Sequence, residues 1–219
     1  MRATKTQILA LALASLCTAA PLMADEKMPK MMYKSTETPS YAVLSAQDGL
    51  EIRSYAPRIT AEVTVSGTRS AAIGKGFRIL AGYIFGNNIA GAKVAMTSPV
   101  GQVASEKIAM TSPVAQSAAG ADWTVQFTMP AGYNLQSLPA PKDPAIRFVS
   151  HPSTRQVALQ FSGLASGAVL KTQEALLRAK AANKGLNLGA GPFYYFYDDP
   201  FTLPWNRRTE VAFDLLAGN

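Results

Sequence analysis

Few side chains in this sequence could catalyse a reaction or bind a metal. His151 is the single histidine and lies in a Ser-His-Pro-Ser turn, where a neutral imidazole could bind iron. A solvated turn histidine is the commoner interpretation. A Ser-His-Asp hydrolase would need His151 as its base, and the chain has no G-x-S-x-G sequence to support it. Asp198 and Asp199 are adjacent, so on a strand they would point to opposite faces.

A second set of residues could bind a flat anion. The spacing of apolar residues predicts a helix over residues 68–85, whose sheet-facing core positions are Ile73, Phe77, Leu80 and Ile84. The opposite side carries small and basic residues, namely Ala71, Gly74, Lys75, Arg78 and Gly82. Glycine inside a helix costs roughly 1 kcal/mol relative to alanine, so packing or function should explain these positions.

This stripe of small residues has two interpretations. A planar ligand could approach the helix backbone at Gly74 and Gly82, while Lys75 and Arg78 bind its carboxylates. Alternatively, another chain segment packs on the glycines and the two cations are simply solvated. Arg207 and Arg208, near the C-terminus, could also pair with carboxylates, although salt bridges to a neighbouring strand are the simpler interpretation.

One octapeptide occurs twice, as KVAMTSPV at residues 93–100 and as KIAMTSPV at residues 107–114. Each copy alternates β-branched and other residues before Ser-Pro, and proline disfavours helix at the residue before it. The two copies are therefore predicted to be short strands paired as an extended hairpin. Met96 and Met110 are predicted to be core residues rather than thioether ligands.

The remaining pattern predicts an α+β domain. Short strands are predicted before the first helix, and a second helix is predicted over residues 166–183. The further predicted strands lie at residues 41–45, 50–55, 59–65, 146–149, 156–161, 193–197 and 210–215. Because strands and a helix occur in the same order in each half, the sequence predicts two strand-helix-strand units with pseudo-twofold symmetry.

The sequence LAGYIFGNN at residues 80–88, followed by the doubled octapeptide, resembles the SOUL family of heme-binding proteins. Further matching stretches occur in the family's order at residues 41–45, 49–55, 123–130, 138–141 and 206–211. The resemblance covers about residues 41–215. It implies a distorted antiparallel β-barrel flanked by two helices, and in some members a shallow apolar heme groove with basic edges beside the first helix.

The axial heme ligand found in some family members cannot be assigned to the same position of this chain. Some SOUL proteins have a histidine between the arginine and tyrosine of the EIRxY strand, and here Ser54 occupies that position. Serine is a poor iron ligand, so His151 remains a weak candidate for binding the metal. Ser54 is the residue at the position of the ligand in those family members. Groove packing with weak or no ligation by the protein is consistent with this sequence.

The N-terminus predicts export. Residues 1–24 resemble a signal peptide, with Arg2 and Lys5 before a short apolar stretch, and they contain the only cysteine, Cys17. Lipidation of Cys17 is not favoured, because bulky Leu16 precedes it. Residues 25–40 are predicted to be a flexible leader, or a segment that lies across the domain, and residues 41–217 a single domain. No segment of the mature chain is apolar enough to span a membrane.

Charge and composition narrow the function. The formal net charge is +7, and removal of residues 1–24 leaves 19 basic against 14 acidic residues, or +5. The basic residues are scattered, so nucleic acid is not an expected partner. The expected function is a periplasmic or secreted carrier or buffer of heme, another tetrapyrrole or another flat apolar anion. The alternatives are a tetrapyrrole-modifying enzyme or small-molecule hydrolase, and a protein-interaction module.

Overall fold

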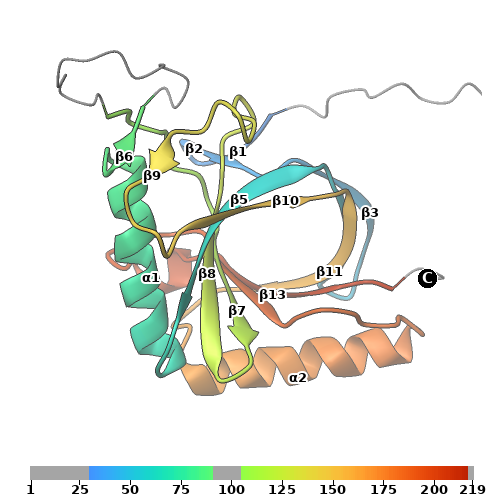
Figure 1. Ribbon diagram of the computed structural model, residues 1–219. Coiled ribbons are helices and arrows are strands. Elements are labelled where there is room, and N and C mark those ends of the chain that lie inside the picture. The colour runs from blue at the N-terminus through green and yellow to red at the C-terminus, as the bar shows by residue number, and fades with distance from the viewer. Residues whose placement is uncertain (1–29, 91–104, 217–219) are drawn as a thin grey trace, which may run out of the picture.

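The computed structural model describes residues 30–90 and 105–216. Two α-helices, α1 (Arg69–Ile84) and α2 (Gly167–Asn183), pack on one large antiparallel sheet that curves into a half-barrel (Figure 1). The sheet contains β3 (Tyr41–Gln47), β4 (Leu50–Tyr55), β5 (Arg58–Val65), β7 (Val114–Ala119), β8 (Asp122–Thr128), β10 (Arg147–His151), β11 (Thr154–Phe161), β12 (Phe193–Phe196) and β13 (Thr209–Asp214). The predicted α+β architecture with two flanking helices is confirmed.

The strands follow the order β10-β5-β8-β7-β12-β13-β11-β4-β3. Without the edge strand β3, this order is symmetric. It reads the same from the opposite end when β4, β5, β7 and β8 are exchanged with β10, β11, β12 and β13, respectively. That is the order expected of two repeated units. A true twofold axis relating the two halves in space stays a prediction.

The two faces of the sheet have different chemistry. On the outer face, Val125 and Phe127 of β8 pack in a core with α1, while Val157 and Phe213 pack in a second core with α2. Because neighbouring residues of a strand point to opposite faces, the inner face receives the intervening polar residues, such as Gln126. Neither helix of the described chain is long and apolar enough to cross a membrane.

Helix α1 begins where the sequence predicts, but its buried face is rotated from the predicted one. Thr68 caps the helix by accepting a hydrogen bond from Ala71 N at 3.3 Å. Leu80 and Ile84 are buried as predicted, whereas Ile73 is only partly buried and Phe77 is 37% exposed. The buried residues of the helix are Ala72, Gly76, Leu80, Ala81, Tyr83 and Ile84.

Gly76 explains the rotation, because it brings the helix backbone against β8. A Cβ atom at residue 76 would lie 2.6 Å from Cγ2 and 2.7 Å from Cβ of Val125, closer than atoms can pack. At Gly74, in contrast, a Cβ atom would meet nothing within 4 Å. Packing therefore accounts for Gly76 and leaves Gly74 unexplained.

This contrast predicts opposite effects for two identical substitutions. We expect Gly76→Ala to lower the free energy of unfolding by about 1–3 kcal/mol, because the added methyl overpacks against Val125. Gly74→Ala should instead raise it by up to about 1 kcal/mol through helix propensity. Urea unfolding followed by circular dichroism measures both, and a stabilised Gly76→Ala variant would contradict the close packing of α1.

The predicted leader is folded from residue 30 onwards. Strands β1 (Met31–Tyr33) and β2 (Thr36–Thr38) form a hairpin, and the backbone O of Glu37 accepts a hydrogen bond from Ser112 N at 2.9 Å. The nearly buried carboxylate of Glu37 accepts another from Ala131 N at 2.8 Å. The interpretation as a flexible leader is wrong for residues 30–40, because these hydrogen bonds hold the segment across the domain.

The doubled octapeptide is described only in its second copy. Residues 93–100 lie outside the described residues, and with them Met96 and the predicted pairing of the two copies. In the second copy Ile108 is buried, Thr111 forms a parallel bridge with Glu37, and Val114 begins β7. A short pair, β6 (Asn88–Ile89) with β9 (Ala140–Pro141), lies beyond the C-terminal end of α1 (Figure 1).

Candidate functional site

A groove of about 770 Å³ lies beside the N-terminal half of α1. Its other sides are closed by the β1–β2 hairpin, by residues 110–114, by Ala165 before α2, and by the segment from Phe196 to Thr209 that links β12 to β13. Pockets that bind small molecules and cofactors usually measure about 300–1,000 Å³. The groove is therefore large enough for a ligand of cofactor size.

Apolar side chains form part of the groove's surface. Ile73, Phe77, Met110, Val114 and Phe196 all line it. The Phe77 ring also packs edge to face with Phe127, with ring centroids 5.5 Å apart, and the residue is still 37% exposed. Two residues predicted to be core, Ile73 and Phe77, are thus partly exposed where a flat apolar ligand could contact them.

Two guanidinium groups at the groove have no carboxylate partner among the described residues. Arg69 donates to the backbone O of Ala165 at 3.3 Å and to Gln116 Oε1 at 3.5 Å. Burial lowers the pKa of Arg69, although arginine remains charged at neutral pH. Arg207 donates to the backbone O of Thr202 and of Pro200. Both cations can still pair with an anionic ligand.

The other charged groups at the groove hold its rim together. Asp198 accepts hydrogen bonds from Tyr33 OH at 3.0 Å, from Lys34 Nζ and from Arg208 N at 2.7 Å. Burial would raise the pKa of Asp198, but these donors outweigh it and hold the pKa below its ordinary value. This ionised carboxylate therefore fastens the β1–β2 hairpin to the segment after β12.

The structure brings only one of the predicted ligand-binding residues to the groove. Gly74 lines it, whereas Lys75 and Arg78 are exposed on α1 outside its lining. Arg78 donates from Nε to the backbone O of Gly74 at 3.2 Å. Gly82 is half-buried one turn further on, and a Cβ atom there would lie 3.9 Å from Cβ of Asn87.

The two remaining predicted residues lie elsewhere on the sheet. Ser54 is half-buried on β4, between Ala42 of β3 and Arg155 of β11 in the strand register. His151 ends β10, and its Nε2 lies 2.8 Å from Thr60 Oγ1 and 3.2 Å from Glu62 Oε1. Neither residue lines the groove.

The groove offers few atoms that could bind iron. Tyr33 and Tyr197 line it, but burial and neighbouring carboxylates raise the pKa of both phenols, which disfavours a phenolate ligand. Met110 is the one thioether among the described lining residues. No group of three or more His, Cys, Asp or Glu residues suited to a metal ion occurs in the described parts of the chain.

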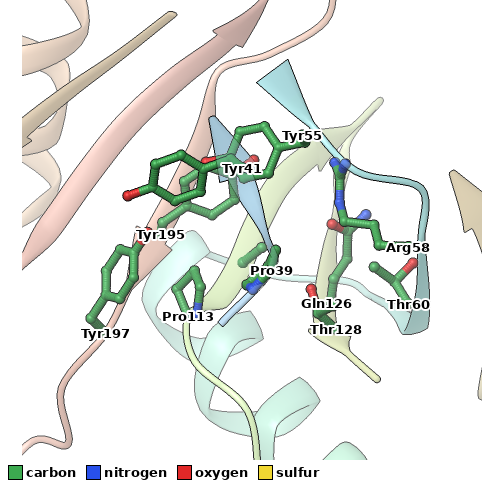
Figure 2. Close-up of a pocket in the computed structure, with 11 residues that line it drawn as sticks. Pro39, Tyr41, Tyr55, Arg58, Thr60, Pro113, Gln126, Thr128, Tyr195 and Tyr197 are labelled. Atoms are coloured by element: carbon green, nitrogen blue, oxygen red, sulfur yellow. The ribbon is translucent and has the colours of Figure 1, made fainter. Parts of the chain in front are cut away.

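The inner face of the half-barrel has a second, much smaller cavity of about 20 Å³, room for about one water molecule. Figure 2 shows Tyr41, Tyr55, Tyr195 and Tyr197 on one side of it and Arg58, Thr60, Gln126 and Thr128 on the other. Because these side chains already fill the inner face, the groove beside α1 is the better candidate for a ligand site.

Sequence reasoning missed Arg69, Tyr33 and the groove itself. Arg69 is the first residue of α1, directly after the Thr68 cap, and the sequence does not show that Ala165 and Gln116 approach it. The strongest available signal was Arg207-Arg208, which was predicted to form salt bridges. Arg208 pairs instead with Glu210, two residues further along its own segment, at 2.7 Å, and Arg207 does not pair with any described carboxylate.

Fold and groove together define an α+β half-barrel with an open, partly apolar, cation-bearing groove. The sequence model of the SOUL heme-binding protein family matches residues 36–214, and the chain belongs to this family. No curated protein matches the chain.

Solved structures share the fold at low sequence identity. A hydrolase from Listeria innocua is 14% identical with a TM-score of 0.51, over 79% of this chain and 94% of its own. The C-terminal domain of EcmrR is 13% identical with a TM-score of 0.53, over 80% of this chain and 98% of its own. At such identities the likeness is one of fold alone.

Proposed function

We propose that this protein binds heme or another tetrapyrrole in the groove beside α1. The observation that carries the proposal is the pairing of apolar lining residues with two guanidinium groups, Arg69 and Arg207, that lack carboxylate partners in the described chain. A tetrapyrrole presents the complementary chemistry, a flat apolar ring with acidic side chains. Membership of a heme-binding family supports the same ligand.

The residues present fit such a ligand without a histidine. Ile73 and Phe77 would contact the ring, and Arg69 and Arg207 would pair with its carboxylates. Ser112 also lines the groove, and its buried hydroxyl has no hydrogen-bond partner among the described residues. Bound heme would supply a redox-active iron, and Met110 is the thioether of the described lining that could hold it.

The physiological role we propose is that of an exported carrier or buffer. The N-terminal 24 residues have the pattern of a signal peptide, which supports a periplasmic or secreted protein. A groove open to solvent, without histidine in its described lining, suits a ligand that must be released as well as bound. His151 is engaged by Thr60 and Glu62 instead, so we do not assign it to iron.

Titration with hemin, followed at the Soret band, tests the proposal. We expect a saturable one-to-one shift that an unrelated basic protein does not produce. Arg69→Gln should weaken the affinity roughly tenfold, the size expected for the loss of one charge-assisted hydrogen bond. Arg78→Gln is the matched control, because it removes an exposed cation of the same helix outside the groove.

Two results would contradict the proposal. One is a titration that never saturates, which would indicate the general adhesion of hemin to apolar surfaces. The other is equal loss of affinity in Arg69→Gln and Arg78→Gln, which would show that overall charge rather than the groove binds the ligand. Thermal unfolding of each variant checks that it remains folded.

A further inference from the structure

The loop between β12 and β13 carries apolar side chains that nothing in the described chain covers. Phe201, Leu203 and Trp205 are 94%, 53% and 69% exposed. They alternate with Thr202 and Pro204, which are half-buried, so one side of the loop is apolar and faces solvent. We call Phe201, Leu203 and Trp205, with Leu164, the loop tip.

Leu164 belongs to this surface although it comes from another loop. It is 61% exposed, and the neighbouring Gly163 donates from its backbone N to the O of Pro204 at 2.9 Å. Exposed apolar residues elsewhere in the described chain lie on other elements, for example Val43 and Leu44 on β3 and Leu176 on α2. Contiguous exposed apolar residues of this kind mark interaction sites.

The loop tip is held in a fixed shape. Asp199 accepts hydrogen bonds from the backbone N of Phe201 at 2.7 Å and of Thr202 at 3.0 Å. Arg207 donates to the O of Thr202 at 2.7 Å and to the O of Pro200 at 2.6 Å, and the 3-10 helix η1 (Pro204–Asn206) follows. The apolar side chains are therefore presented outward by a braced loop.

We propose that the loop tip inserts into the interfacial region of an anionic lipid bilayer. A side chain as exposed as Phe201 projects from the surface, whereas protein–protein contacts usually gather their anchors in close-packed patches. A bilayer needs no complementary shape, and tryptophan is enriched at its interface. The net charge is +7 for the full chain and +5 without residues 1–24, and either balance adds attraction to anionic headgroups.

The carboxylates beside the loop tip are already engaged. Asp198 pairs with Lys34, and Asp199 is bound by loop amides and the Thr202 hydroxyl. The groove shares Pro200, Thr202 and Arg207 with this loop, so insertion would bring the groove close to the lipid surface. Insertion of the loop tip does not require a bound tetrapyrrole, and the binding experiment uses none.

Tryptophan fluorescence provides a local test, because the chain has only two tryptophans and Trp123 is half-buried on β8. With vesicles of phosphatidylcholine and phosphatidylglycerol, we expect a blue shift of emission that Trp205→Phe removes. The double substitution Phe201→Ser, Trp205→Ser should reduce binding in vesicle flotation roughly tenfold or more. Val43→Ser, Leu44→Ser is the control, since both residues are 50% exposed.

All variants carry the same N-terminal segment, so differences between them report on the loop. Equal binding of the two double variants, or no flotation of the unaltered protein, would overturn the proposal. The proposal would also be overturned if the protein did not bind vesicles but its loop tip bound a co-purifying protein. The loop tip would then be a protein-docking surface. Matching circular dichroism spectra for the variants establish that loss of binding is not loss of folding.

Discussion

Glu210→Ala is expected to lower the free energy of unfolding by about 3–5 kcal/mol, the range found when one partner of a buried ion pair is removed. Glu210 is fully buried on β13, and its carboxylate accepts two hydrogen bonds from Arg53, at 2.7 and 2.9 Å. Arg208 and Tyr197 donate to the same group. The substitution would leave the guanidinium of Arg53, which is 1% exposed, largely uncompensated inside the half-barrel.

The matched control removes the other carboxylate that contacts Arg53. Glu51 accepts a hydrogen bond from Arg53 Nε at 2.8 Å but is 37% exposed, so Glu51→Ala should cost about 1 kcal/mol or less. Urea unfolding at neutral pH measures both variants. Equal losses in the two variants would contradict a dominant role for the buried pair.

The buried carboxylate of Glu210 also makes the free energy of unfolding depend on pH. Burial would raise the pKa of Glu210, but Arg53 and Arg208 outweigh burial and hold it below the ordinary value. A lowered pKa contributes stability that is present above the unfolded pKa, near 4.5, and is lost as pH falls through the folded pKa. Unfolding curves between neutral and acid pH should therefore show a shallower decline for Glu210→Gln than for the unaltered protein.

Gly74→Trp is expected to weaken hemin binding by about a hundredfold. A Cβ atom at residue 74 would meet no neighbour within 4 Å, so a large side chain there extends into the groove instead of disturbing the core. The ring would lose its approach to the α1 backbone, and with it several apolar contacts at roughly 25 cal/mol per Å².

The control for Gly74→Trp is Gly82→Trp, on the same helix but outside the groove lining. Hemin titration at equal protein concentration compares the two, with thermal unfolding to show that both fold. If Gly82→Trp lost affinity and Gly74→Trp kept it, the ligand would lie further along the helix, as the Gly82 and Arg78 interpretation predicts.

The sequence predicted the elements of this fold well because amphipathic periods and turn residues mark them locally. Thr68 and Ser166 cap α1 and α2 where the pattern breaks, and residues 69–84 and 167–183 are helical. The rotation of α1 was missed because a glycine carries no hydrophobic signal. Gly76 is buried for steric reasons that depend on Val125, about fifty positions away in sequence.

The site was much less predictable because it is assembled from segments that are distant in the chain. Tyr33, Arg69 and Arg207 meet at one groove only after the β1–β2 hairpin folds across the domain. The environment of His151 depends in the same way on Thr60 of the neighbouring strand β5, whose hydroxyl lies 2.8 Å from its Nε2. Residue types suggested a flat anionic ligand, but the three-dimensional fold selects which cations can reach it.

The most direct test of the central claim is amide hydrogen exchange of the protein with and without hemin, read by mass spectrometry along the chain. If hemin binds in the groove, we expect slower exchange in residues 33–36, 69–77 and 196–209, which are three of the segments that line it. Protection confined to the surroundings of His151 or to the strands around the inner cavity, with the three groove segments unchanged, would contradict it.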